Sequence, residues 1–309
     1  MYHIIINPAS RSGKGLQIWK KQVEPVLQEE KIVYRNYFSE KAGDVKRIAS
    51  EILSSNQARP ITIILLGGDG TVNEALQGMG DTSGVILGYI PTGSSNDLAR
   101  DMGISKDPLK ALHLILHTGT PRPMDLGCVT YEDGSTRRFI VSSGVGFDAA
   151  VCEEALHSRM KVALNRIGLG KLTYLGIALK QLFAAKEISC KLTLDDNAPI
   201  DIHRILFSAI MIHRYEGGGF MFCPNADCTD GFLDLCVAGD LSKIVILCAL
   251  PTAFWGKHYA VKGITPYRAR KVHIETSSPL WVHTDGEVQR KSSSFTVTCE
   301  QHSAQFIQS

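Results

Sequence analysis

The chain has 309 residues, more than one hydrophobic core usually organises, so we expect two domains. Its formal net charge of +2 is too small to indicate a nucleic-acid-binding protein, and no run of eighteen apolar residues predicts a membrane-spanning helix. The eight cysteines are scattered without a CxxC pair, and Met1 leads directly into strand-like YHIIIN, which leaves no room for a signal peptide. These features favour a cytoplasmic protein with reduced thiols.

The first 125 residues alternate between strand-like and helix-like segments. Apolar runs at residues 3–6, 32–38, 61–66 and 85–90 are separated by stretches with helical spacing of apolar residues. This alternation predicts a Rossmann-like α/β domain at residues 1–125, with a mostly parallel sheet and helices on both faces. Ligands of such sheets bind outside the carboxyl ends of the strands.

Three polar, glycine-containing loops follow three of these strands: NPASRSGKG at 7–15, GGDGTVNE at 67–74 and PTGSSND at 91–97. Any one of them is explained equally well by a turn that only reverses the chain. Three such loops at one edge of a sheet favour a nucleotide site instead.

The GGDG loop carries the most chemical information. Gly68 and Gly70 let a ligand approach bare backbone N–H groups, and Thr71 can begin a helix whose N-terminus favours an anion. Asp69 would repel phosphate unless a divalent cation lies between them. The loop therefore indicates a nucleotide site with a metal ion, and phosphoryl transfer as its chemistry.

The first loop is not a P-loop, because Lys14 is followed by Gly15 instead of serine or threonine. The hydroxyl of Ser10 and the N–H groups of glycines such as Gly13 still suit a phosphate, with Lys14 as the counter-charge.

In the third loop, Ser94, Ser95 and Asn96 suit ribose or phosphate oxygens, and Asp97 can join Asp69 in binding Mg²⁺. The same residue types also cap helices, so both roles stay open.

Residues 126–294 have a different texture, with short strand-like runs separated by turn signals such as DDNAP and TDG. We expect a β-rich sandwich-like or barrel-like domain for the lipid substrate, interrupted by helices near residues 149–186 and 241–253. The strands near 295–309 are expected to return and complete the first domain. The basic, apolar stretch at 157–186 fits a helix on an anionic membrane surface and an ordinary packed helix equally well.

Three further segments contain acidic candidates. Asp285 and Glu287 belong to HTDGE, where Asp-Gly is a hairpin signal but either carboxylate can also act as a base. Asp227 and Asp230 lie before a strand, in a surface loop or a cation site. Asp125, in MDLG, fits a turn or a third carboxylate near the metal.

Taken together, the segments NPASRSGKG, GGDGTVNEALQGM, PTGSSNDLAR, MDLG, SSGVGFDAAV, PNADCTDG and HTDGE resemble the soluble bacterial diacylglycerol kinases, also called YegS-like lipid kinases. That family shares its catalytic domain with sphingosine and ceramide kinases. The match runs in order over essentially the whole chain. NAD kinases and phosphofructokinases have related GGDG loops, but the spacing to GSSND and the late TDGE favour the lipid kinases.

The resemblance implies an N-terminal α/β domain and a C-terminal β-sandwich, with ATP and Mg²⁺ in the cleft between them. It assigns nucleotide contacts to Asn7, Ser10, Ser39, Ser94 and the segment Gly68, Asp69, Gly70, Thr71, Asn73 and Glu74. Two extra residues, Arg11 and Ser12, lengthen the first loop relative to the NPxSG form of the family, which leaves the individual contacts there open.

The resemblance also implies the metal ligands and the base. Asp69, Asp97 and Asp125 match the acidic network around the active-site magnesium, whereas Asp227, Asp230 and the backbone of Phe232 match a second, structural Mg²⁺ site. Glu287 matches the proposed proton acceptor, with Asp285 beside it, although the sphingosine kinase branch assigns that role to the aspartate matching Asp69.

We therefore expect an ATP- and Mg²⁺-dependent kinase that phosphorylates the hydroxyl of a lipid, most simply diacylglycerol, at a membrane surface. A homodimer is compatible with the sequence. The alternatives are an NAD kinase-like enzyme with a soluble substrate and a regulatory protein that binds nucleotide without transferring phosphate.

Overall fold

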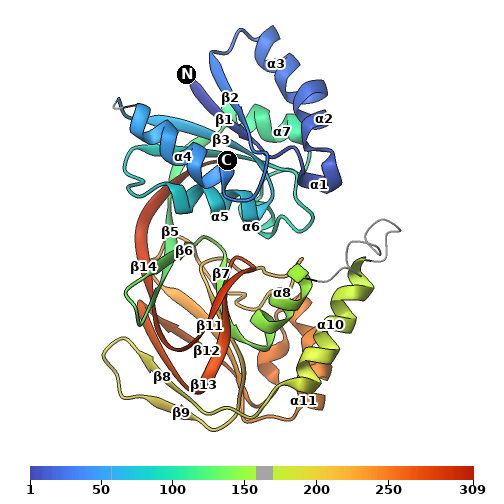
Figure 1. Ribbon diagram of the computed structural model, residues 1–309, viewed down its shortest axis with the longest axis vertical. Helices are drawn as coiled ribbons and strands as arrows, with labels where there is room; N and C mark the ends of the chain where they lie inside the picture. The colour runs from blue at the N-terminus through green and yellow to red at the C-terminus, as the bar shows by residue number, and fades with distance from the viewer. Residues whose placement is uncertain (57, 158–169) are drawn as a thin grey trace.

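The computed structural model describes residues 1–56, 58–157 and 170–309. Its N-terminal half is built on four parallel strands in the order β4-β3-β1-β2 (Figure 1). The strands are β1 (Tyr2–Ile6), β2 (Tyr34–Phe38), β3 (Ile61–Gly67) and β4 (Val85–Pro91). The predicted α/β fold is confirmed, and the three polar loops all leave the carboxyl end of this sheet.

Helices cover both faces of this sheet, as predicted (Figure 1). Helix α4 packs on α5, and α7 packs on the π-helical turn η1. The apolar positions of α4 predicted from their helical spacing (Val45, Ile48, Ala49 and Ile52) are all buried. The elements are α1 (Ser10–Gly13), α2 (Gly15–Ile18), η1 (Trp19–Val23), α3 (Glu24–Glu29), α4 (Asp44–Ser55), α5 (Asp69–Gly78), α6 (Asp97–Asp101), α7 (Pro108–His113) and η2 (Leu114–Thr118).

The second half is rich in antiparallel strands, which confirms the predicted β-sandwich-like domain. Its strands are β5 (Thr120–Tyr131), β6 (Thr136–Phe139), β7 (Ser142–Gly146), β8 (Cys190–Leu194), β9 (Ile200–Ile202), β10 (Ile205–Met211), β11 (Leu233–Gly239), β12 (Ile264–Ala269), β13 (Lys271–Thr284) and β14 (Glu287–Gln308).

Helices interrupt these strands where the sequence predicts. They are α8 (Phe147–His157), α10 (Gly170–Ala184), α11 (Lys243–Ala249) and the 3₁₀ turns η3 (Leu250–Trp255) and η4 (His258–Ala260). Residues 158–169 of the basic stretch lie outside the described residues. No helix among the described residues is long and apolar enough to cross a membrane.

Two long strands, β5 and β14, connect the halves as an antiparallel ribbon that passes from the N-terminal sheet into the β-rich half (Figure 1). Near its end, β14 joins the N-terminal sheet, where Phe306 pairs with Leu87 of β4 in parallel. Ala304, Phe306 and Ile307 are buried in the same apolar core as the first four strands. Ile140 and Val141 also belong to this core, so its membership extends beyond residue 125.

Candidate active site between the two halves

Two adjoining cavities lie at the carboxyl ends of β3 and β4. One, of about 370 Å³, opens between the halves of the chain, and we call it the interdomain cavity. The other, of about 500 Å³, faces the N-terminal loops, and we call it the loop cavity. They share the lining residues Gly68, Gly70, Gly93 and Ser94.

The loop cavity brings together most of the predicted nucleotide contacts. Its lining includes Asn7, Ser10, Ser39, Gly68, Gly70, Thr71, Glu74 and Ser94. Asn7 Nδ2 donates to Thr71 Oγ1 at 3.1 Å, and the hydroxyls of Ser10 and Thr92 are 2.8 Å apart, so side chains hold the three loops in register.

Two glycines allow the second and third loops to touch. A Cβ built on Gly68 would lie 3.0 Å from Gly93 Cα, and one on Gly93 would lie 2.6 Å from Gly68 Cα. No residue with a side chain fits this approach without moving the backbone. The backbones of the two loops therefore touch at this point, where no side chain keeps a phosphate away from them.

The first loop differs from the prediction at two residues. Gly13 and Lys14 are exposed and are absent from the described lining of both cavities. The cations that do line the loop cavity are Arg11 and Lys41. The reason is local, because Arg11 and Ser12 adopt left-handed backbone conformations with φ of 52° and 57° and turn the chain before Lys14.

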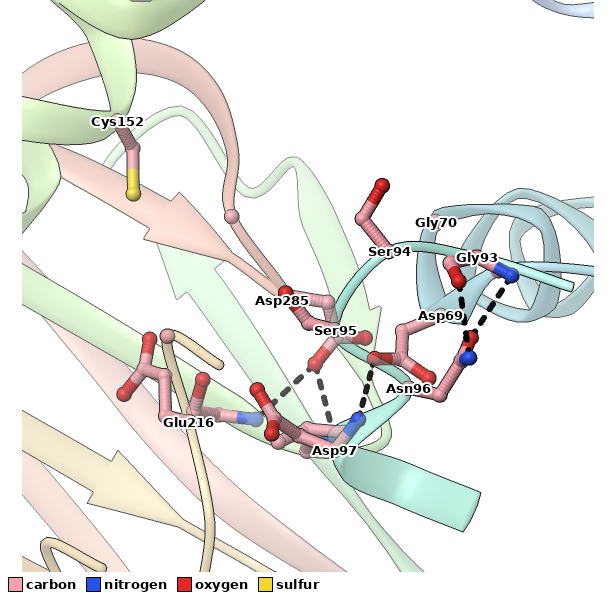
Figure 2. A pocket seen from close by; sticks show the side chains of 15 residues that line it. Asp69, Gly70, Gly93, Ser94, Ser95, Asn96, Asp97, Cys152, Glu216 and Asp285 are labelled. Carbon is pink, nitrogen blue, oxygen red and sulfur yellow. Dashed lines mark hydrogen bonds between the residues drawn. The ribbon is translucent and has the colours of Figure 1, made fainter. Parts of the chain in front are cut away.

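Asp69 and Asp97 lie beside each other on the wall of the interdomain cavity (Figure 2). The N–H of Asp97 donates to Asp69 Oδ2 at 2.8 Å, and the hydroxyl of Tyr89 donates to Asp69 Oδ1 at 3.0 Å. Asp97 in turn accepts from Arg100 at 3.1 Å and from the N–H of Gly218 at 2.7 Å.

Burial raises the pKa of Asp69 to about 6, and the nearby charge of Asp97 adds to this effect. Burial also raises the pKa of Asp97. Two carboxylates that are difficult to ionise beside a cavity fit a hard divalent cation, which would relieve their repulsion. The pair therefore fits the Mg²⁺ that the resemblance implies.

Ser95 and Asn96 line the interdomain cavity instead of the loop cavity. The amide of Asn96 is engaged within its own loop, since its Oδ1 accepts from the N–H of Gly93 and its Nδ2 donates to the Gly93 carbonyl, both at 2.9 Å. Asn96 thus shapes the loop.

Asn73, for which a nucleotide contact is predicted, is absent from the described lining of both cavities. Its side chain is completely buried and bridges the two halves, donating to Asp285 Oδ2 at 2.7 Å and to the Arg138 carbonyl at 3.2 Å. Its Oδ1 accepts from Arg137 at 3.1 Å. An amide with these partners is a structural link.

Asp285 and Glu287 enter the site from the same turn but have different surroundings. The carboxylate of Asp285 accepts from Asn73 and from three backbone N–H groups, those of Ile140, Val141 and Ser142, at 2.7–3.0 Å. Glu287 lines the loop cavity, and its Oε1 would lie 3.8 Å from a Cβ built on Gly70. Among the described residues, no side-chain partner binds the Glu287 carboxylate. Of the two, Glu287 is therefore the one able to accept a proton.

Asp125 is not part of the Asp69–Asp97 pair, which corrects its predicted place. It is completely buried, and its oxygens accept from the N–H groups of Gly231 at 2.6 Å and His302 at 2.7 Å. His302 lies where the pairing of β5 with β14 shifts register, so Asp125 stabilises that irregularity.

The two aspartates of the predicted second magnesium site both have partners within the chain. Asp230 forms an ion pair with Arg268 and accepts from the N–H of Phe232, and Asp227 accepts from Thr229. The guanidinium groups of Arg268 and Arg270 lie 4.4 and 4.8 Å from the centre of the Phe232 ring. Burial raises the pKa of Asp230, and the charges of Asp227 and Asp125 add to this while Arg268 opposes it, so Mg²⁺ at this place stays a prediction.

The structure brings together Asp148, Glu216 and the buried His283, a cluster that the sequence does not predict. His283 Nε2 lies 3.2 Å from Asp148 Oδ2 and 3.2 Å from Glu216 Oε1, and Glu216 lines the interdomain cavity. His283 stands in HTDGE, but Asp148 and Glu216 come from distant segments, and no spacing in the sequence connects the three.

Comparisons with known proteins agree with this architecture. Residues 1–129 match the family described as the diacylglycerol kinase catalytic domain, and residues 140–301 match the YegS C-terminal NAD kinase beta sandwich-like domain. A diacylglycerol kinase of Mycobacterium tuberculosis is 32% identical over 225 residues, covering 73% of this chain and 70% of its own. A diacylglycerol kinase of Bacillus subtilis is 28% identical over 289 residues, covering 92% and 88%.

A solved diacylglycerol kinase structure from Bacillus anthracis strain Sterne superposes with a TM-score of 0.70 at 21% identity, covering 100% of this chain and 96% of its own. This likeness concerns the fold. The two family matches and the sequence relatives go further, and together they show that the chain belongs to the diacylglycerol kinase and YegS-like family of lipid kinases.

Proposed function

We propose that this protein is an ATP- and Mg²⁺-dependent kinase that phosphorylates the hydroxyl of a membrane lipid, with diacylglycerol to phosphatidic acid as the simplest reaction. One observation carries the proposal. A cavity suited to phosphates and a cavity lined by the Asp69–Asp97 pair meet at the Gly68–Gly93 contact, so a nucleotide and an acceptor can approach each other there.

In this proposal the loop cavity holds the triphosphate of ATP. The backbone N–H groups around Gly68 and the side chains of Arg11 and Lys41 supply donors and positive charge. Mg²⁺, when held by Asp69 and Asp97, would supply neutralisation of the charge on the phosphates.

The acceptor lipid presents its hydroxyl from the interdomain cavity. The hydroxyl oxygen bonds to the γ-phosphorus while the bond from that phosphorus to the β–γ bridging oxygen breaks, and ADP leaves. Glu287 takes the hydroxyl proton. Asp285 is unsuited to that step because four donors already occupy its oxygens.

We further propose that the enzyme works from the cytoplasm at a membrane surface. Large apolar side chains are exposed on α10, α11 and η3, which lie together at one side of the β-rich half (Figure 1). Trp255 is 70% exposed and Ile244 is 67% exposed. We call this set the apolar face; it comprises Phe183, Ile244, Val245, Phe254 and Trp255. Exposed apolar groups of this kind suit a lipid surface.

The test measures phosphate transfer from γ-labelled ATP with Mg²⁺ in three arms: diacylglycerol vesicles, NAD, and no acceptor. Label in the lipid alone is the expected result. Label in NADP would replace the proposal with a soluble NAD kinase activity. Binding of ATP without turnover in any arm would instead identify a nucleotide-binding regulatory protein.

A further inference from the structure

Two polar side-chain atoms on the wall of the interdomain cavity lack hydrogen-bond partners among the described residues. Ser142 is 1% exposed, and its Oγ is buried with no partner in the described part of the chain. Glu216 Oε2 is likewise buried and unpartnered among these residues, whereas its Oε1 faces His283. Both residues line the interdomain cavity. Buried polar atoms are usually satisfied, so two unsatisfied ones in one cavity indicate a missing ligand group.

Glu216 is held firmly in place. Its backbone N–H donates to the Phe220 carbonyl at 2.9 Å, and Gly217, Gly218 and Gly219 all have positive φ. The N–H of Gly218 donates to Asp97, and this hydrogen bond connects the turn that contains Glu216 to one of the proposed metal-binding carboxylates. Figure 2 shows Glu216, Asp97, Asp69 and Asp285 around the same cavity.

His283 identifies this cluster as a proton-sharing group and not a metal site. The N–H of Gly286 lies 3.2 Å from His283 Nδ1, which requires a lone pair on that nitrogen. The ring proton is therefore on Nε2, where it faces the two carboxylates and leaves no lone pair for a cation. His283 and Asp148 are positioning residues for Glu216.

The charges around the cavity determine what group can bind. Burial raises the pKa of Glu216 to about 7, and the Asp148 charge adds to this, whereas His283 and the Ser142 hydroxyl lower it. Burial and the Asp148 charge therefore outweigh these two groups, and a further donor would stabilise the ionised Glu216 carboxylate. With Asp69, Asp97 and Asp148 nearby, an anionic head group is disfavoured, and a hydrogen-bond donor is favoured.

We propose that Glu216 and Ser142 form a subsite for a second hydrogen-bond donor, a hydroxyl or an ammonium group, on the acceptor lipid. The preferred acceptors are then lipids whose head carries such a group beside the phosphorylated hydroxyl. Diacylglycerol, with a single hydroxyl, leaves the subsite unfilled. This inference rests on the proposed lipid kinase activity and names its substrate class.

The test compares kcat/KM for three acceptors in the same mixed micelles: 1,2-diacylglycerol, a monoacylglycerol of equal chain length, and a long-chain amino alcohol. The wild-type protein should favour at least one donor-bearing acceptor over diacylglycerol by roughly 10-fold to 100-fold. In Glu216→Gln this ratio should fall toward one, mainly through KM. Preference for the monoacylglycerol identifies a hydroxyl as the donor, and preference for the amino alcohol identifies an ammonium.

Because the ratio is measured within one protein sample, partial unfolding of a variant does not change it. Ser142→Ala should lower the ratio as well, and Glu187→Gln, which alters a surface glutamate paired with Arg204, should leave it unchanged. An unchanged ratio in Glu216→Gln, or no wild-type preference, overturns the inference and leaves the kinase proposal standing. No phosphorylation of any lipid overturns the proposed function itself.

Discussion

Asp285 and Glu287 are two residues apart, yet their environments give them different tasks. Four donors converge on the Asp285 carboxylate, whereas no described side chain binds Glu287. The occupied oxygens of Asp285 hold neighbouring segments in place. The carboxylate of Glu287, which has no such partners and lies beside a cavity, is available for proton transfer.

Exchanging each carboxylate for its amide should separate the two roles. Asp285→Asn places an N–H₂ group among backbone N–H donors, so the free energy of unfolding should fall by roughly 2–4 kcal/mol. Glu287→Gln should leave the stability within about 0.5 kcal/mol of wild type but lower kcat at least roughly 100-fold. Urea unfolding and steady-state kinetics measure both quantities. A stable but inactive Asp285→Asn protein would assign the base to Asp285 instead.

Asp69 should make the metal-free protein less stable as the pH rises. Its folded-state pKa of about 6 lies above the ordinary value of 3.8, so its stabilising contribution is fully present below about pH 4 and is lost as the pH rises through 6. The Asp69→Asn side chain does not ionise, so the stability of this variant does not fall in this way as the pH rises. Between pH 4 and 7 the variant should gain roughly 2–4 kcal/mol relative to wild type in urea unfolding with EDTA, while its turnover is abolished.

Magnesium supplies the control for that experiment. Because a ligand that binds only the folded state stabilises it, Mg²⁺ should raise the stability of wild type at pH 7 and leave Asp69→Asn unaffected. Parallel pH dependences of the two proteins in EDTA would contradict the role of burial at Asp69.

At this scale, sequence reasoning predicts which loops meet but not what each side chain contacts. Thr71 and Ser94 line the predicted cavity because their loops end adjacent parallel strands. Asn73 and Asp125 have the same residue types and instead bind backbone or other side chains. Sequence does not reveal whether a polar atom meets a ligand or a buried N–H, since that depends on chain segments more than a hundred residues away.

At the scale of elements, the ribbon of β5 and β14 joins the two halves, and its irregularity is held by Asp125. The register shifts between Glu300 and Ala304, and His302 adopts a φ of 51° there. The shift redirects the ribbon from the β-rich half into the N-terminal sheet. Alternating apolar residues predict the strands but not the shift, because the pattern on either side of it is regular.

Asp125→Ala should therefore destabilise the protein without touching the cavities. It leaves two backbone N–H groups without their acceptor, so we expect a loss of roughly 2–5 kcal/mol in the free energy of unfolding. Thermal unfolding checks the loss, and the KM for ATP in the folded fraction should stay at the wild-type value. A changed KM with unchanged stability would return Asp125 to the predicted metal network.

At the scale of the whole molecule, side-chain hydrogen bonds join the two halves at two places. Asp101 of α6 accepts from Arg214 at 2.6 Å and lies 2.8 Å from His213, and Arg138 donates to the Met79 carbonyl at 3.0 Å. The succession of an α/β half and a β-rich half was predictable, because near residue 125 alternating strand and helix patterns give way to short strand-like runs. The contacts of Asp101 and Arg138 between the halves were not predictable, because no periodic pattern in the sequence relates the residues that they join.

The apolar face gives a whole-molecule prediction about membranes. Replacing Ile244 and Trp255 together by alanine removes two of its most exposed side chains, so vesicle binding should weaken roughly 10-fold to 100-fold. Co-sedimentation with anionic vesicles measures this change. Activity on a short-chain, water-soluble acceptor should be retained, and Leu109→Ala, which alters an exposed apolar residue on α7, provides the matched control. Equal sedimentation of the double variant and wild type would exclude this face as the membrane contact.

The position of β14 at the end of the chain also determines when the N-terminal sheet can finish folding during synthesis. The sheet begun by residues 2–91 stays incomplete until Ala304, Phe306 and Ile307 have left the ribosome, because they fill its core and extend its edge. Until then the β4 edge and its apolar neighbours are exposed, which is when chaperones bind and aggregation begins. The N-terminal half, although made first, is thus expected to finish folding last, together with the rest of the chain.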